Sequence, residues 1–297
     1  MTAPAQTFDV LDAAEWHGRR AAHVGRVNDL VGQYLDRRAA GHAHPVLDFL
    51  FTYYSLKPAH LRRWHPGFGV ALTGDGIEDY RGRSGYGDTT VRGVPAVTVT
   101  SDLLKRRGSA VDFVSTLVRR TAARPAQLGC FGLHEWAMVY RGGDAALRHD
   151  VPLRLGHDGT DAVVESMPLR CTHYDAFRFF TPEAVGRNRL QPTRESQTAT
   201  EQPGCLHATM DLYKWAYKLG PAVPGELLAD CFALAADVRE LDMRASPYDL
   251  RDHGYPAVAI ETAGGKAEYA AAQRGFASRG AELRRRLLVV CETLTLA

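Results

Sequence analysis

Apolar residues recur at helical spacing over long stretches of this chain, and this periodicity constrains the fold more than any other feature. Between residues 13 and 40 they alternate with Arg and Asp at intervals of three and four, which predicts a long amphipathic helix. The same spacing predicts further helices over 101–124, 205–219, 224–243 and 266–290. A helix with one apolar face must bury it against another element. We therefore expect a mainly α (α+β) fold, with many helices in one domain over residues 1–297.

Shorter segments show other patterns. Proline and cap residues predict short helices over 44–54 and from Thr181, and a helix N-terminus at 246–249; we also expect a buried helix over 130–140. Eight glycines between residues 67 and 93 predict loops or short hairpins, and Val94–Thr100 is a candidate strand in this glycine-rich region, 67–100. Residues 151–173 have a Gly156–Gly159 turn between β-forming runs, so we expect a small β-hairpin insertion there.

The composition excludes several classes of protein. Of the 297 residues, 45% are hydrophobic and 24% charged, which is typical of a globular chain. No apolar run approaches the ~18 residues of a membrane-spanning helix, so we expect no membrane partner. The first ten residues lack the basic start and apolar core of an export signal, and the five cysteines form no CxxC pair. We therefore expect a cytoplasmic protein without a disulfide framework.

Two histidines lie four residues before an aspartate. His44 precedes Asp48, and His207 precedes Asp211. Residues four apart share one face of a helix, so each pair can bind one metal ion or let the carboxylate orient the imidazole for proton transfer. These four side chains are our candidate catalytic residues.

Two further histidines have a close carboxylate. His134 adjoins Glu135, and adjacent helical residues diverge by about 100°, so we do not expect these two to share a ligand easily. His173 and Asp175 would face the same side of a strand. For any one pair the alternative is an ordinary hydrogen bond in the core or at the surface. We expect at least two of the pairs to meet in one site.

Aromatic residues surround these pairs and can either wall a pocket for a flat ligand or fill the core. Trp64 and Trp215 lie beside polar residues and are the strongest pocket candidates. We take the candidate substrate-binding residues from the segments that contain both histidine and aromatic residues. One arginine comes from the charged segment around residue 242. This set is Trp64, His65, Trp215, Tyr54, His134, His173, Asp175 and Arg244.

Three other features carry weaker hypotheses. Cys130 or Cys205 could act as a nucleophile beside a histidine, although buried cysteines are more often inert. Glu240, Asp242 and Arg244 could grip a polar substrate or simply form a solvated helix end. A basic face in the last helix, with Arg279 and Arg284–Arg286, could contact phosphates, although the net charge is only +2.

Four segments resemble a bacterial family whose members commonly carry the label 3-methyladenine DNA glycosylase. They are His44–Tyr54 (HPVLDFLFTYY), Arg63–Gly67 (RWHPG), Pro203–Trp215 (PGCLHATMDLYKW) and Leu241–Leu250 (LDMRASPYDL). The resemblance implies hydrolysis of the N-glycosidic bond of an alkylated purine, with damaged DNA as the partner and no cofactor. An aromatic slot would hold the extruded base, and Asp48 or Asp211 would orient water with its histidine as proton carrier.

The residues themselves leave two alternatives open. His44, Asp48, His207 and Asp211 would together offer two nitrogen and two oxygen ligands, which suits Fe, Mn or Zn in an oxygenase or hydrolase acting on a small molecule. A non-catalytic protein that binds a small molecule in an aromatic pocket is the second alternative. Convergence of these four side chains would favour the metal hypothesis.

Overall fold

The computed structural model describes residues 8–296, and for residues 104–106 it describes the backbone alone. Most of the segment expected to lack an export signal, residues 1–10, therefore lies outside the described residues. The described chain is mainly α-helical with a small sheet, as the periodicity predicts.

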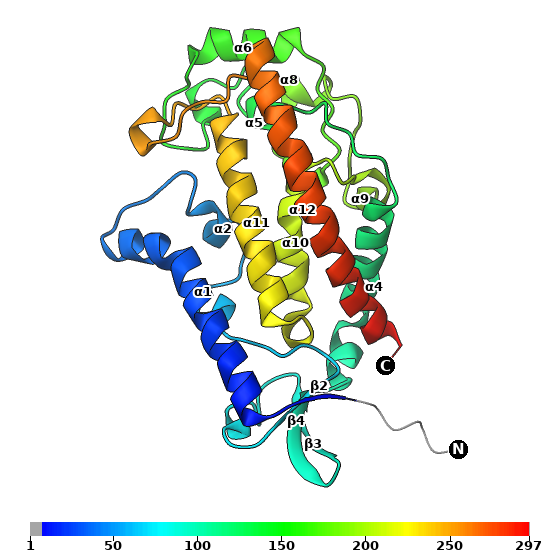
Figure 1. Cartoon of the computed structure of the whole chain (residues 1–297). Helices are drawn as coiled ribbons and strands as arrows, with labels where there is room; N and C mark the ends of the chain where they lie inside the picture. The colour runs from blue at the N-terminus through cyan, green and yellow to red at the C-terminus, as the bar shows by residue number, and fades with distance from the viewer. Residues whose placement is uncertain (1–7, 297) are drawn as a thin grey trace.

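Long helices run along the length of the molecule (Figure 1). The helices are α1 (Ala13–Ala39), α2 (Phe49–Thr52), α3 (Pro58–Leu61), α4 (Asp102–Ala122), α5 (Leu133–Ala137), α6 (Gly156–Ser166), α7 (Tyr174–Phe177), α8 (Pro182–Val185), α9 (Gln197–Thr200), α10 (Leu206–Lys218), α11 (Gly225–Arg244) and α12 (Ala263–Thr295). The strands are β1 (Asp9–Leu11), β2 (Val70–Thr73), β3 (Tyr86–Val91) and β4 (Val94–Val99).

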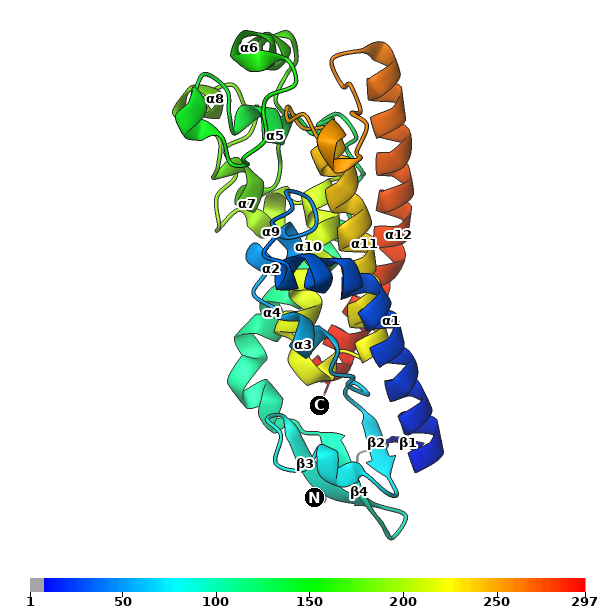
Figure 2. The same ribbon diagram turned by 90° about the vertical axis from the view of Figure 1, so that its left-hand side faces the viewer.

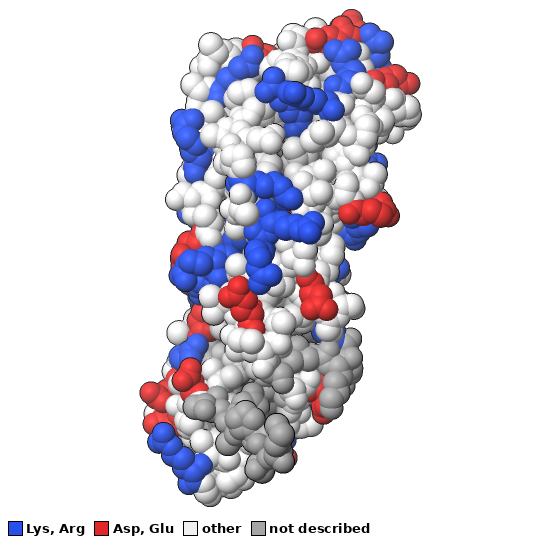
Figure 3. Space-filling view, turned by 90° about the vertical axis from the view of Figure 1, so that its right-hand side faces the viewer, with Lys and Arg blue, Asp and Glu red and all other residues white. Residues whose placement is uncertain are grey.

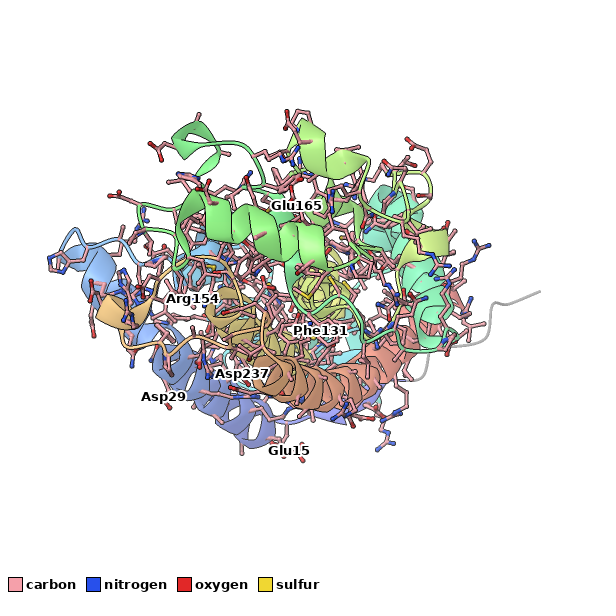
Figure 4. All side chains as sticks on the ribbon, turned by 90° about the horizontal axis from the view of Figure 1, so that it is seen from above. Glu15, Asp29, Phe131, Arg154, Glu165 and Asp237 are labelled. Carbon is pink, nitrogen blue, oxygen red and sulfur yellow. The ribbon has the colours of Figure 1, made fainter. Side chains whose placement is uncertain are left out.

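The central helix is α11, which packs against α10, α12 and α1. The helix α12 also packs against α4, and together these helices enclose the main hydrophobic core. In a view turned by 90°, the short helices α5 to α8 lie toward one end of the molecule and the sheet lies at the opposite end (Figure 2). Seen from above, α6 lies toward one side of the molecule and α1 and α12 lie toward the other (Figure 4).

The long helices begin and bury their faces as their sequences predict. Asp12 caps α1 by accepting a hydrogen bond from the Glu15 N–H at 2.9 Å, and the Glu15 carboxylate accepts from the Asp12 N–H in return. Along α1 the buried residues Trp16, Val27 and Val31 lie on the stripe that faces the neighbouring elements. Local capping and the apolar stripe therefore specify this helix together.

The sheet forms in the glycine-rich region and has the strand order β1-β2-β4-β3. The strands β1 and β2 are parallel, and the other two pairs are antiparallel. The turn between β3 and β4 places Arg92 and Gly93 at positive φ (52° and 82°), the conformation that matches the twist of a two-residue hairpin. The strands β3 and β4 thus form a β-hairpin in the glycine-rich region. The strand predicted over Val94–Thr100 is confirmed as β4.

The prediction of a β insertion over 151–173 is wrong, because the helix α6 occupies the middle of that segment and no named strand lies in it. Its buried residues Thr160, Val163 and Val164 have helical spacing, and this stripe outweighs the strand preference of the two valines. No helix begins at 246–249 either. The Pro247 carbonyl accepts a hydrogen bond from the Arg154 N–H, and Tyr248 forms an isolated antiparallel bridge with Leu153 instead.

Among the described helices, none combines the length and the apolar character needed to cross a lipid bilayer.

Candidate functional site

Four potential metal ligands meet in the interior between three helices. The short helix α5 supplies His134 and Glu135, α10 supplies His207, and α11 supplies Asp242. One nitrogen or carboxylate oxygen from each residue lies within 4.8 Å of those of the other three, and all four residues are buried. We call this group the buried centre.

A sharp turn brings α5 into position. Phe131 and Gly132, the two residues before α5, both have positive φ (50° and 74°). For phenylalanine this conformation costs about 1 kcal/mol or more, and packing must hold it. The Trp136 indole N–H donates a 2.8 Å hydrogen bond to the Ala245 carbonyl at the end of α11. This anchor fixes α5 against the helix that carries Asp242.

Charged side chains inside the centre contact one another directly. The Nε2 of His134 lies 2.8 Å from Asp242 Oδ1. The Arg239 guanidinium, one turn before Asp242, donates to Glu135 at 3.2 Å and to the other oxygen of Asp242 at 3.3 Å. Arg239 is only 2% exposed, so these contacts compensate the charges of both carboxylates away from water.

The charges shift the pKa values of these groups in opposite directions. Burial lowers the pKa of His134, but the Asp242 carboxylate outweighs burial, and the resulting pKa lies well above the ordinary value. Burial raises the pKa of Asp242, and the positive side chains around it more than reverse that effect. Burial and then repulsion from Asp242 raise the pKa of Glu135.

The imidazole of His207 is neutral and incompletely partnered. Burial and then the charge of His134 lower its pKa well below the ordinary value. Its buried Nδ1 has no hydrogen-bond partner among the described residues. Its ring lies edge-on to His134 at a centroid distance of 4.4 Å and stacks on His173 at 5.4 Å. A neutral imidazole with a free nitrogen is the form that binds metal ions.

Two cavities reach the buried centre, and His207 lines both. The large cavity has a volume of about 550 Å³ and includes His134, Cys205 and Tyr269 in its wall. The small cavity has a volume of about 220 Å³ and is lined by Glu135 and Arg239 together with aromatic rings. His134 and Glu135 thus diverge into different cavities, as helical geometry predicts, yet they belong to one group of ligand atoms. The sequence predicts that these two adjacent residues do not share a ligand easily. The structure corrects that expectation, because both belong to the same group of potential metal ligands.

A second buried network lies one helical turn further along α10. Lys214 Nζ donates to Asp175 at 2.6 Å and to Asp211 at 3.1 Å, and the Tyr54 hydroxyl donates to Asp211 at 2.8 Å. His173 lies between Glu201 (3.1 Å) and Asp211 (3.7 Å).

Burial raises the pKa of Asp175, but Lys214 outweighs it and leaves the pKa below its usual value. His173, Asp175 and Asp211 also form a potential ligand group. The ammonium of Lys214 contacts both aspartates, and Arg178 lies 3.3 Å from Asp175. Because side-chain cations already compensate the aspartates, this group has less need of a metal ion.

The structure does not bring His44 and Asp48 to either group of ligand atoms. The Asp48 carboxylate accepts a 2.8 Å hydrogen bond from the His44 backbone N–H and lies 3.4 Å from Arg37. The Nδ1 of His44 accepts from the backbone N–H groups of the next turn, and its ring lies against His253. This pair therefore caps a turn. The proposed ligand set of His44, Asp48, His207 and Asp211 does not assemble among the described residues.

Several predicted pocket residues lie outside the two cavities. Trp64 is buried and donates its indole N–H to Glu226, while the Nδ1 of His65 lies 2.7 Å from the Tyr86 hydroxyl. Trp215 packs against Phe113.

Two other members of the predicted set are held by nearby polar groups. Arg244 pairs with Glu268 and with a backbone carbonyl. The Tyr54 hydroxyl is occupied by Asp211. Of the predicted substrate-binding set, His134 lines the large cavity, Asp175 lines the small cavity, and His173 lies behind His207.

The weaker hypotheses fare differently. Cys130 and Cys205 line the large cavity, and Cys130 Sγ lies 3.6 Å from His134 Nδ1. Burial raises the pKa of Cys205, so this thiol remains protonated, which argues against a nucleophilic role.

The predicted phosphate-binding face of α12 is not free. Arg284 is buried, and the other three arginines each pair with a carboxylate.

Sequence reasoning missed the roles of Glu135, Asp242 and Arg239 at this centre. The signal for Asp242 lies in its position along α11. Together with Cys231, Ala235 and Val238 it forms the spacing i, i+4, i+7 and i+11, so a carboxylate stands on a buried apolar stripe. A charge placed on such a stripe needs a partner, and this requirement points to a site.

Comparison with known proteins adds no relative: no family model matches the chain, and neither the curated proteins nor the solved structures contain a match.

Proposed function

We propose that this protein is a metal-dependent enzyme acting on a small molecule, with one divalent cation held by His134, Glu135, His207 and Asp242. The observation that carries the proposal is the convergence of one ligand atom from each residue within 4.8 Å. Ligands at metal–ligand distances of about 2.0–2.2 Å are at most about 4.4 Å apart when they lie on opposite sides of an ion. The centre is therefore close to the size that a bound ion requires.

The chemistry of the ligands supports the same proposal. Two imidazoles and two carboxylates suit Fe, Mn or Zn better than Ca. His207 offers a neutral ring with a free nitrogen, and the other three residues already have oriented side chains. A bound cation would supply Lewis acidity or an activated water. Arg239 would hold the two carboxylates, and the large cavity would admit the substrate to the His134 and His207 side.

Metal content tests this proposal directly. We expect about one equivalent of Fe, Mn or Zn per chain in protein purified without added metal, and its loss in His207→Ala. This variant removes a neutral ring without a hydrogen bond at Nδ1, so the fold should tolerate it better than the loss of a charge. His44→Ala and Asp211→Asn are matched controls that should keep the metal. Zinc, which has no redox chemistry, would indicate a hydrolase, whereas iron or manganese would be compatible with either a hydrolase or an oxygenase.

Two outcomes would contradict the proposal. One is a folded wild-type protein that takes up no metal even when each of the three ions is added. The other is a metal that remains bound to both His207→Ala and Asp242→Ala, since the ion would then lie elsewhere. Circular dichroism of each variant establishes that it is folded.

The small cavity favours a second candidate, a DNA base glycosylase. Its wall combines the rings of Phe49, Tyr53 and Phe179 with the carboxylates of Glu135 and Asp175. A volume of about 220 Å³ suits one flat base, and a carboxylate can stabilise the cationic sugar that forms when the base leaves.

The glycosylase candidate predicts abasic sites in methylated duplex DNA. We expect their formation to fall in Asp175→Asn and to persist in Trp64→Phe, whose ring lies outside both cavities. DNA that stays intact under alkali after treatment with excess protein would refute this candidate. If ligands stabilise the protein and neither activity is found, the non-catalytic binding protein remains.

A further inference from the structure

Two arginines line the large cavity from backbone segments that pair with each other. Leu169 and Asn188 form a parallel bridge, and the Arg189 N–H donates a 3.0 Å hydrogen bond to the Leu169 carbonyl. Arg170 and Arg189 each follow one residue of this isolated bridge, and both line the cavity. The buried Asn188 side chain clamps the pair by exchanging two hydrogen bonds with the Cys171 backbone, at 2.8 and 2.9 Å.

Neither guanidinium has a carboxylate partner among the described residues. Several other described arginines do, including Arg154 and Arg178 near the same end of the molecule. Like charges on neighbouring backbone segments repel each other and lower stability. Arg170 and Arg189 are exposed and unneutralised on a backbone that is held in place, and such a pair can bind an anion because each guanidinium can hold a carboxylate or phosphate through two hydrogen bonds.

The cavity also has an unused polar atom in its interior. Gln273, on α12, is 1% exposed and lines the cavity. Its Nε2 donates to the Gly204 carbonyl at 2.6 Å, whereas its buried Oε1 has no partner among the described residues. An unsatisfied acceptor of this kind costs stability unless a ligand or water donates to it.

The surroundings favour a negatively charged ligand as well. Segments that follow α4 and α9 supply part of the cavity wall, through Gln127–Cys130, Gln202 and Cys205. Lys and Arg side chains gather over the middle of the face on which α4 and α9 lie, with few acidic side chains among them (Figure 3). Such a face attracts anions to this side of the molecule.

We propose that the large cavity binds a small molecule carrying a carboxylate or a phosphate, and that Arg170 and Arg189 hold this anionic group. The remainder of the molecule reaches past Gln273 toward His134 and His207. This last statement rests on the proposed metal centre, whereas the arginine contact does not. A volume of about 550 Å³ is within the usual range for small-molecule sites.

Calorimetric titration of the full chain with three probes tests the inference. The probes are succinate, inorganic phosphate and the uncharged succinamide. We expect succinate or phosphate to bind, and the one that binds identifies the anionic group; succinamide should not bind. In Arg170→Gln/Arg189→Gln the affinity should fall at least about tenfold, because two charge-assisted contacts are lost. The control Arg92→Gln/Arg120→Gln removes two exposed arginines away from the cavity and should stay within about twofold.

Each remaining outcome overturns the inference. One such outcome is that neither succinate nor phosphate binds to the wild type. The others are an anion affinity of Arg170→Gln/Arg189→Gln equal to that of the wild type, and binding of succinamide as tight as that of succinate. The titrations are repeated after dialysis against a chelator. Anion binding that survives shows that the arginine site holds whether or not the protein carries a metal, and binding that disappears places the anion on a metal instead. Failure of the metal proposal and failure of this inference are thereby distinguishable.

Discussion

Replacing Lys214 with methionine tests whether the second buried network is held by charge. Lys214 is 8% exposed, and its ammonium contacts Asp175 at 2.6 Å and Asp211 at 3.1 Å. Removing one partner of a buried ion pair costs about 3–5 kcal/mol, because the remaining charge lacks compensation. Asp211 keeps its hydrogen bond from Tyr54, and Arg178 lies 3.3 Å from Asp175, so we expect the lower end, about 3 kcal/mol.

Urea unfolding monitored by circular dichroism measures this effect. For an m-value of about 3 kcal/mol/M, a loss of about 3 kcal/mol lowers the unfolding midpoint by about 1 M. Lys218→Met is the matched control, since Lys218 is exposed and lies over the same Trp215 ring at 5.5 Å. We expect the control to cost less than about 1 kcal/mol.

A double variant separates charge from packing. In Lys214→Met/Asp211→Asn the uncompensated charge at residue 211 is gone, while the amide can still accept from Tyr54. We expect the double variant to be more stable than Lys214→Met alone by about 1–2 kcal/mol. Equal unfolding midpoints for Lys214→Met and Lys218→Met would refute the reasoning, as would a double variant less stable than Lys214→Met.

Two further predictions concern stability. Burial first, and then nearby positive charge, lower the pKa of His65 to about 4. The unfolded chain therefore binds more protons than the folded protein below about pH 6.5. The free energy of unfolding should fall by about 2 kcal/mol between about pH 6.5 and pH 4 for this partly buried ring. His65→Gln, which can still bond the Tyr86 hydroxyl, should show a smaller loss of thermal stability on acidification; an equal loss would exclude His65 as the cause. Gly275→Ala in α12 meets no atom within 4 Å and should stabilise by about 0.5–1 kcal/mol, whereas a Cβ at Gly265 would lie 2.0 Å from the Ala259 carbonyl oxygen and should destabilise. Chemical denaturation of both glycine variants checks this, and the same sign for the two would contradict it.

The long helices could be predicted from the sequence because their information is local. In α1, α10 and α11 the apolar stripe and the terminal signals lie within the segment itself. The segment 156–166 shows where this approach fails, since its two central valines favour a strand and its helix is decided by burial of Thr160, Val163 and Val164 together. Propensity is a weak guide when packing opposes it.

The candidate site was predictable only in part, for a related reason. The spacing of His207 and Asp211 correctly places both on one helix. Their partners are distant in sequence, namely His134 on α5, His173 just before α7 and Tyr54 after α2, and nothing in the local sequence specifies those contacts. The pair of His44 and Asp48 has the same spacing and serves a turn instead. Spacing identifies which side chains can act together, and only tertiary packing decides which of them do.

The arrangement of α10 has a consequence for how this chain can change in length. His207 belongs to the buried centre, while Asp211 and Lys214 belong to the neighbouring network, so thirteen residues of one helix orient both. Inserting or deleting a single residue between His207 and Asp211 would rotate one group relative to the other by about 100°. Such a change would misalign one of the two groups whichever way the helix settled, so variants of this protein should differ in length in the connecting segments and keep the length of α10.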